Sequence, residues 1–231
     1  MAHDGAPRRL APRLLRTVVR AVPTAWLSRV QGVRAVYNFL DDLAWAGINE
    51  TIWEIEGSKM YLDPWDGSPM RRTFRSYLST PKEPETARLF KEVIRPGDTV
   101  VDIGANVGFF SLLAARLVGT AGRVYAFEPE PQNFALLTKN IALNGYTHVV
   151  AYRKAVWRRA GLVKLYLSNA LDTGAHTLRP KHATRYFDQD RDGHAIEVEC
   201  VVLDAFLAPG SREVSSIGVE TERAVGYPLG G

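Results

Sequence analysis

The residues best suited to chemistry lie in one short stretch, where an acid and two glycines accompany an apolar run. Asp102 lies within the apolar residues 99–103, and Gly104 and Gly108 follow with three residues between them. A strand, a glycine-bearing loop and a helix form a nucleotide-binding arrangement, because the helix amino terminus offers unpaired N–H groups. Glycines also let a ligand approach the backbone closely. The spacing therefore predicts a nucleotide or nucleoside site at this loop.

The glycine pattern separates the candidate ligands. A dinucleotide-binding loop has the pattern G-x-G-x-x-G, but counting from Gly104 the second glycine is Asn106 and the third is Phe109. A side chain at the second position would crowd a pyrophosphate. A phosphate loop is absent as well, because residues 57–59 (GSK) lack the upstream glycine. The loop suits a ligand without pyrophosphate, such as S-adenosylmethionine, and disfavours the alternative of an NAD-dependent oxidoreductase.

Glu128 supplies the second half of the pattern. It follows the apolar residues 123–127, and in this topology the end of that strand lies beside the first loop. A carboxylate there can accept hydrogen bonds from both ribose hydroxyls. The ordinary alternative is a surface acid at a helix start, since Pro129 follows it. Asp102 has two open roles: it holds the loop by bonding its amides, or it faces the amino group of S-adenosylmethionine.

Strands and helices alternate around these residues. We predict strands over residues 99–103, 123–127 and 149–156, and helices over residues 84–94, 109–118 and 134–144. Two short strands precede them within residues 52–62, and β-type runs follow at 162–167 and 196–203, separated by a polar surface loop or lid at 169–194. The predicted fold class is α/β, a Rossmann-like parallel sheet with helices on both faces.

The composition fits one domain with an extension. The chain has 231 residues, of which 46% are hydrophobic and 23% charged, as in an ordinary soluble globular protein. We predict a basic helical extension over residues 1–48, lead-in strands and a helix over 49–97, and a cofactor-binding domain over 98–231. The single cysteine, Cys200, cannot form an internal disulfide, so nothing indicates an oxidising compartment and we expect a cytoplasmic location.

The net charge of +4 is concentrated at the start of the chain. The first 36 residues contain seven arginines and one acid, Asp4. We expect these basic residues to form the solvated face of a helix. The alternative is a weak contact of this helix with a membrane surface. No stretch is long and apolar enough to span a bilayer. The basic residues lie away from the glycine loop and the tryptophans form no stacking stripe, so we expect a small molecule rather than a nucleic acid as partner.

Four segments together resemble the FkbM family of methyltransferases. They are residues 82–86 (KEPET), 100–109 (VVDIGANVGF), 124–131 (VYAFEPEP) and 201–207 (VVLDAFL). The resemblance covers about residues 50–231 and rests on the combination, not on the loop alone. It implies a class I methyltransferase fold, S-adenosylmethionine as methyl donor, and O-methylation of a small hydroxylated acceptor such as a sugar or natural product. The expected cofactor-binding residues are Glu83, Asp102, Gly104, Asn106, Gly108 and Glu128.

The chain departs from that family near its end. The family's fourth core strand usually ends in I-K-x-D-x-E-G-A-E, and the matching residues 217–225 read IGVETERAV. Glu222 keeps its acid and Glu220 replaces an aspartate, but the lysine, the glycine and the second glutamate are replaced. The chain then stops, so we expect an incomplete sheet with an open edge that an oligomer or a partner could cover. The alternative to an active enzyme is therefore a catalytically impaired fragment or a partner-dependent subunit.

A methyltransferase acting on a hydroxyl group can use a general base to remove its proton. The candidates are Glu220, Glu222 and His176, the last of which lies in the polar loop. For each of them a role without chemistry is the alternative: Glu220 and Glu222 can be acids at the end of a sheet, and His176 can be an ordinary loop histidine. No metal site is expected, because His176 and His182 share no recognised ligand spacing with an acid.

Overall fold

The computed structural model describes residues 31–46, 48–66, 70–79, 83–167, 178, 195–206 and 216–219. The chain divides into two compact units, residues 1–50 and residues 51–231. The first unit contains helix α3 (Gln31–Trp45), which lies within the basic helical extension expected over residues 1–48. Residues 1–30 of that extension lie outside the described residues, as does most of the polar segment 169–194.

The second unit alternates strands and helices after a short lead-in. The lead-in elements are β1 (Ile52–Ile55), β2 (Ser58–Tyr61), α4 (Met70–Ser79) and α5 (Pro84–Val93). The alternating part comprises β3 (Thr99–Ile103), α6 (Phe109–Val118), β4 (Arg123–Phe127), α7 (Pro131–Leu143) and β5 (Val149–Tyr152). The remaining elements are β6 (Ala155–Val156), β7 (Gly161–Tyr166), β8 (Ala195–Val201), α9 (Leu203–Phe206) and β9 (Ser216–Val219). The α/β class is confirmed.

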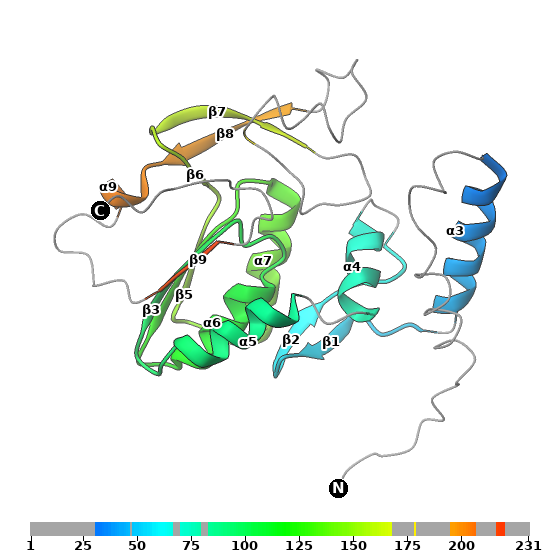
Figure 1. The fold of residues 1–231 in the computed structure, drawn as a ribbon, viewed down its shortest axis with the longest axis horizontal. Coiled ribbons are helices and arrows are strands. Elements are labelled where there is room, and N and C mark those ends of the chain that lie inside the picture. The colour runs from blue at the N-terminus through cyan, green and yellow to red at the C-terminus, as the bar shows by residue number, and fades with distance from the viewer. Residues whose placement is uncertain are drawn as a thin grey trace, which may run out of the picture. The chain divides into compact units, whose positions relative to one another are not determined.

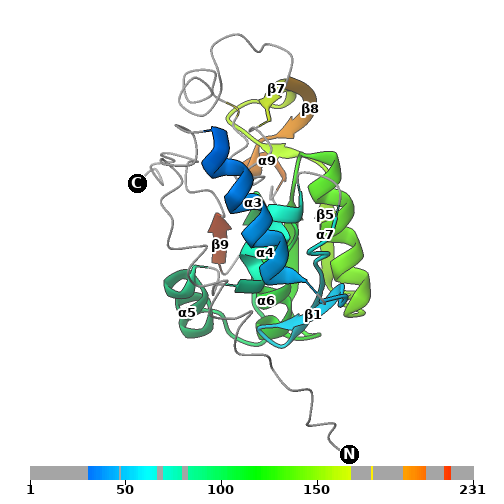
Figure 2. The ribbon, with the colours of Figure 1, turned by 90° about the vertical axis from the view of Figure 1, so that its right-hand side faces the viewer.

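The main sheet has the order β5-β4-β3-β9, and all its described pairs are parallel. Helices α5, α6 and α7 lie along one face of this sheet (Figures 1 and 2). Parallel strands need crossover connections, and α6 and α7 supply them for β3, β4 and β5. β3 has a neighbour on each side, so the loop that follows it emerges at the middle of the carboxyl edge. Among the described strands β9 lies at the edge of the sheet.

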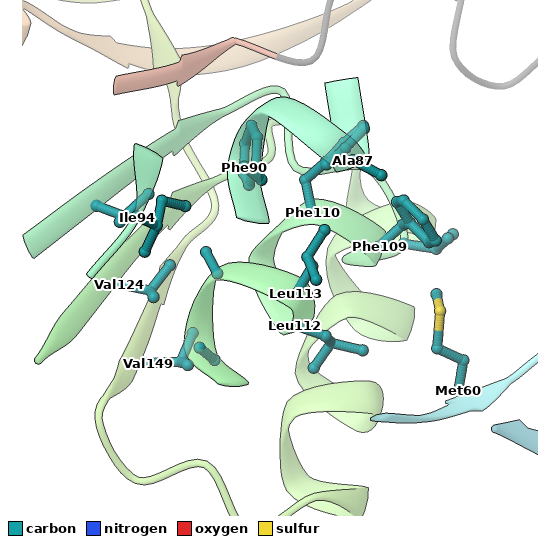
Figure 3. Packing of buried hydrophobic residues seen from close by; sticks show 14 of the residues in the cluster. Met60, Ala87, Phe90, Ile94, Phe109, Phe110, Leu112, Leu113, Val124 and Val149 are labelled. Carbon is teal, nitrogen blue, oxygen red and sulfur yellow. The ribbon is translucent and has the colours of Figure 1, made fainter. Parts of the chain in front are cut away.

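The core lies between the sheet and its helices (Figure 3). Helix α6 is apolar nearly all round, and eight of its residues are buried, as expected for a helix covered by the sheet on one side and by other helices elsewhere. Phe110 of α6 packs on Phe90 of α5, with ring centroids 4.9 Å apart, while Val124 and Val149 contribute from the sheet. Burial of each such large side chain stabilises the fold by roughly 1.5–3 kcal/mol.

The other face of the sheet carries an aromatic cluster. Phe127 and Tyr152, the last residues of β4 and β5, stack with centroids 5.1 Å apart, and Phe206 of α9 meets both edge-on. Tyr125 completes the cluster. These contacts place the short helix α9 against the carboxyl ends of β4 and β5.

Two local expectations differ from the structure. The strand expected over residues 149–156 is broken, because β5 belongs to the main sheet and β6 pairs instead with β8 in a second sheet of order β6-β8-β7. The change of sheet occurs at Arg153 and Lys154, and Lys154 forms an ion pair with Glu199 of β8. Helix α4 is not among the elements expected from the sequence. No described helix has the length and apolarity needed to cross a membrane.

Candidate functional site

Residues 104–108, hereafter the glycine loop, join β3 to α6 through three positions of positive φ. Gly104 has φ 83°, Gly108 has φ 100°, and Asn106 has φ 51°. Glycine adopts such angles without steric cost, and asparagine is among the few other residues that do so routinely. Gly108 is also closely packed, since a Cβ built there would lie 2.8 Å from Cδ1 of Leu137 on α7. The residue types expected for this loop therefore match the backbone conformation that it adopts.

Every backbone N–H group of the glycine loop donates to a protein acceptor. The amides of Gly104 and Ala105 both donate to the carbonyl of Phe127, at 2.8 and 3.0 Å. The remaining donors and acceptors are Asn106 N to Glu128 Oε2 at 2.8 Å, Val107 N to Asn106 Oδ1 at 2.7 Å, and Gly108 N to Ala105 O at 2.8 Å. No loop amide is left to bind a phosphate oxygen. This geometry supports the expectation of a ligand without a pyrophosphate.

Glu128 follows β4 directly and is 4% exposed. Its Oε2 accepts the Asn106 amide and its Oε1 accepts the amide of Glu130, each at 2.8 Å. Burial raises the pKa of Glu128 to about 7, although the two backbone hydrogen bonds oppose the rise. The Asn133 side chain bonds to Glu128 as well. A carboxylate has about four acceptor positions, so one remains for a ribose hydroxyl. Glu128 therefore holds the glycine loop, a role additional to the one expected from the sequence.

Asp102 is fully buried near the end of β3. Its Oδ2 accepts the hydroxyl of Ser111 on α6 at 2.5 Å, whereas its Oδ1 has no hydrogen-bond partner. Burial raises the pKa of Asp102 to about 6, and the Ser111 hydrogen bond opposes that rise. Asp102 does not bond the loop amides, each of which has another acceptor. A buried acceptor without a donor is costly, so Oδ1 is an acceptor that a ligand's N–H group would satisfy.

These groups fit S-adenosylmethionine. Its amino group requires an acceptor, which Asp102 Oδ1 can provide, and its ribose hydroxyls require an acceptor, which Glu128 can provide. The loop lacks the unpaired amides that a phosphate would need. The donors and acceptors present therefore match a cationic nucleoside better than an anionic dinucleotide.

Glu83 is the remaining expected cofactor-binding residue. It is the N-cap residue of α5 with φ 38°, and its Oε2 accepts the Thr86 hydroxyl at 3.3 Å. Within the part of the chain that the structure describes, it makes no hydrogen bond with the glycine loop. A left-handed glutamate is unusual and costs on the order of 1–3 kcal/mol. Its role beside the cofactor stays a prediction.

The three candidate bases, Glu220, Glu222 and His176, lie outside the described residues. The same holds for His182. Among the residues that are described, no group of three histidine, cysteine or acidic side chains is arranged to hold a metal ion. Cys200 is buried, and its thiol donates to the carbonyl of Arg159. Cys200 belongs to a small hydrophobic cluster with Ala155, Leu165 and Val198.

Three buried polar residues near the site were not anticipated from the sequence. Ser111 binds Asp102, Asn133 begins α7 beside Glu128 with its Oδ1 unpartnered, and Asn140 binds the loop carbonyl of Val107 at 2.8 Å. One signal is present in the sequence: asparagine disfavours helix interiors, yet Asn140 lies within α7, four residues before the C-cap residue Asn144. Such spacing places both on one helix face and indicates specific partners for them.

The parallel α/β fold and this site resemble those of class I methyltransferase domains, whose cofactor is S-adenosylmethionine. In agreement, residues 72–160 match the family model of the TRM5/TYW2 methyltransferase domain. That range includes the glycine loop, Asp102 and Glu128. The expected cofactor is thus confirmed at the level of the domain class.

Individual relatives match shorter stretches. The 31-O-demethyl-FK506 methyltransferase FkbM of Streptomyces tacrolimicus is 51% identical over 47 residues, which are 20% of this chain and 18% of the relative. A protein-L-isoaspartate O-methyltransferase of Aeropyrum pernix is 43% identical over 56 residues, 24% of this chain and 22% of the relative. The chain thus spans less than a quarter of the length of either relative.

Among solved structures, a crystal structure of TYW2 from P. horikoshii in complex with MeSAdo resembles the chain at 17% identity. The alignment covers 62% of this chain and 64% of that one, with a TM-score of 0.40.

Proposed function

We propose that the chain binds S-adenosylmethionine at the glycine loop and directs its methyl group to a hydroxyl oxygen of a small molecule, as in the FkbM family. The observation that carries the cofactor part is the buried Asp102 Oδ1 without a donor, beside a loop whose five amides are all committed. The short match to FkbM, at 51% identity, supports an oxygen acceptor. The same match supports a natural product as the acceptor class.

The bound cofactor supplies an electrophilic methyl group, so the protein's own contribution is chiefly positioning. Glu128 fixes the glycine loop and offers an acceptor to a ribose, and Asp102 offers an acceptor to an ammonium group. A base that takes the hydroxyl proton completes the chemistry. Our candidates for it are Glu220, Glu222 and His176, each to be tested by a single substitution.

The cofactor part is tested by calorimetric titration of the purified chain with S-adenosylhomocysteine. Wild-type protein should bind it, Glu128→Ala should bind at least about tenfold more weakly, and NAD should give no signal. NAD binding in place of S-adenosylhomocysteine would overturn the assignment. A folded wild-type chain that binds neither compound would overturn it too.

Turnover separates the proposed enzyme from the alternative of a cofactor-binding fragment or partner-dependent subunit. The assay is transfer of labelled methyl from S-adenosylmethionine to a panel of hydroxylated sugars and polyketides. Label in a product ether supports the enzyme. Cofactor binding with no transfer to any member of the panel supports the alternative.

A further inference from the structure

Asn140 is a fully buried amide on α7 that joins two segments distant in the sequence. Its Oδ1 accepts the backbone N–H of Tyr61 in β2 at 2.7 Å, and its Nδ2 donates to the carbonyl of Val107 in the glycine loop at 2.8 Å. A backbone N–H can only donate and a carbonyl can only accept. The orientation of the Asn140 amide is therefore fixed by both partners, since the flipped amide would face two like groups.

This contact gives the glycine loop an anchor on a third element. The end of β4 and Glu128 hold the loop through its amides, whereas Asn140 holds it through a carbonyl. Val107 is fully buried, so its carbonyl depends on this one side chain rather than on bulk water. Loss of the donor leaves a buried acceptor unpaired, which favours a shift of the loop.

Asn144 is a natural control for Asn140, because it lies one helical turn further on and contacts the same hairpin, which β1 and β2 form. Its Oδ1 accepts the amide of Lys59 at 2.8 Å, and its Nδ2 donates to the carbonyls of Lys59 and Asn140 at 2.7 and 2.8 Å. Both asparagines thus form hydrogen bonds with backbone groups of β2, at Tyr61 and at Lys59. Asn140 alone of the two also reaches the glycine loop.

We propose that Asn140 is a positioning residue for the cofactor, which locks the glycine loop through Val107 and couples it to the hairpin of β1 and β2. The cofactor part of this inference rests on the proposed function. The part about the ordering of the loop is independent of the proposed function, because it follows from hydrogen bonds within the chain alone. A loop already held in one conformation loses less entropy when a ligand binds, so removing the lock weakens binding.

The test compares Asn140→Ala with Asn144→Ala in the full chain without cofactor. Amide hydrogen exchange should show faster exchange at Val107 and Gly108 in Asn140→Ala, and unchanged exchange there in Asn144→Ala. Both variants should loosen the hairpin amides, at Tyr61 and Lys59 respectively. Equal exchange at Gly108 in the two variants would overturn the inference.

Titration with S-adenosylhomocysteine supplies the second readout. Asn140→Ala should bind about tenfold more weakly than wild type, and Asn144→Ala within about twofold. If Asn140→Ala does not fold, Asn140→Asp replaces it at pH 8 or above, where its ionised carboxylate still accepts the Tyr61 amide but offers Val107 no donor. Asn140→Asp should then show the same loss of affinity.

The two proposals fail in different ways. If wild type binds S-adenosylhomocysteine and the Asn140 variants bind it equally well, the positioning role is overturned and the proposed function stands. If wild type does not bind it but Asn140→Ala still loosens the loop amides selectively, the proposed function is overturned and the loop-locking role stands.

Discussion

The Oε2 atom of Glu128 lies 2.8 Å from the backbone nitrogen of Asn106, and this hydrogen bond ties the end of β4 to the loop that follows β3. The acid expected to meet a ribose is thus also a structural member of the loop. The carboxyl group must stay buried to keep that bond, and this burial raises its pKa. Glu128 therefore holds the loop, and in our proposal the same side chain also binds the ribose of the cofactor.

The stability of the cofactor-free chain should fall as the pH rises from about 4 to about 7. The pKa of Asp102 is raised from 3.8 to about 6 and that of Glu128 from 4.5 to about 7, so the folded state binds more protons than the unfolded state in this window. The stabilisation is fully present below the unfolded pKa values and is lost as the pH passes the folded ones. Each group contributes about 3 kcal/mol. Urea unfolding at pH 4, 6 and 8 measures it, and a rising free energy of unfolding would contradict it.

Asp102→Asn should make the chain more stable at pH 8 and weaken its cofactor binding. The amide keeps an oxygen for the Ser111 hydroxyl but removes a buried negative charge, so we expect a gain of up to about 3 kcal/mol at pH 8 and little change at pH 4. Affinity for S-adenosylhomocysteine should fall because the ammonium group loses its anionic acceptor. Unfolding curves and calorimetry on one preparation test both effects, and tighter binding by the variant would refute the role of Asp102.

Gly108→Ala should destabilise the chain by about 1–3 kcal/mol, because its φ of 100° disfavours a side chain and the new Cβ meets Leu137. Gly145→Ala is the control. Gly145 has φ 63° just beyond α7, but a Cβ there meets nothing within 4 Å, so only the backbone strain of about 1 kcal/mol applies. Thermal unfolding compares them. Equal losses would show that the contact with Leu137 relaxes freely.

Leu112→Ala should cost about 2–5 kcal/mol, since Leu112 is 1% exposed in the core between α6 and the sheet. Leu89→Ala, on the outer side of α5 where Leu89 is 53% exposed, should change the stability by less than about 0.5 kcal/mol. Chemical denaturation of both variants gives the comparison. A large effect at Leu89 would indicate that this surface is covered in solution.

The parts of the fold that could be predicted are those specified by local pattern. The apolar runs 99–103 and 123–127 form strands with those bounds, and α6 spans the expected residues 109–118. The run 149–156 is expected to form one strand, yet it divides between two sheets where Arg153 and Lys154 interrupt its apolar residues. Its division depends on pairing with β8, some 45 residues later, which no local pattern contains.

The same distinction holds within the site. Glycine spacing and the position of Glu128 are local signals, so the loop could be located from the sequence. The hydrogen-bond partners of the polar groups lie on other elements. Ser111 of α6 bonds to Asp102, and Asn140 of α7 bonds to the carbonyl of Val107. Hydrogen bonds between elements depend on their packing, and the sequence marks them only by polar residues at positions where apolar ones are usual.

The pairing of β9 with β3 bears on the order in which the chain folds. β3, β4 and β5 follow one another with a single helix between neighbours, whereas Ser216 must return across the whole intervening chain to lie beside Val100. Closing so long a loop is entropically slow, and during synthesis β9 leaves the ribosome after β3, β4 and β5. The hydrogen bond of Glu128 to the glycine loop can therefore form in the nascent chain before β3 acquires its second neighbour.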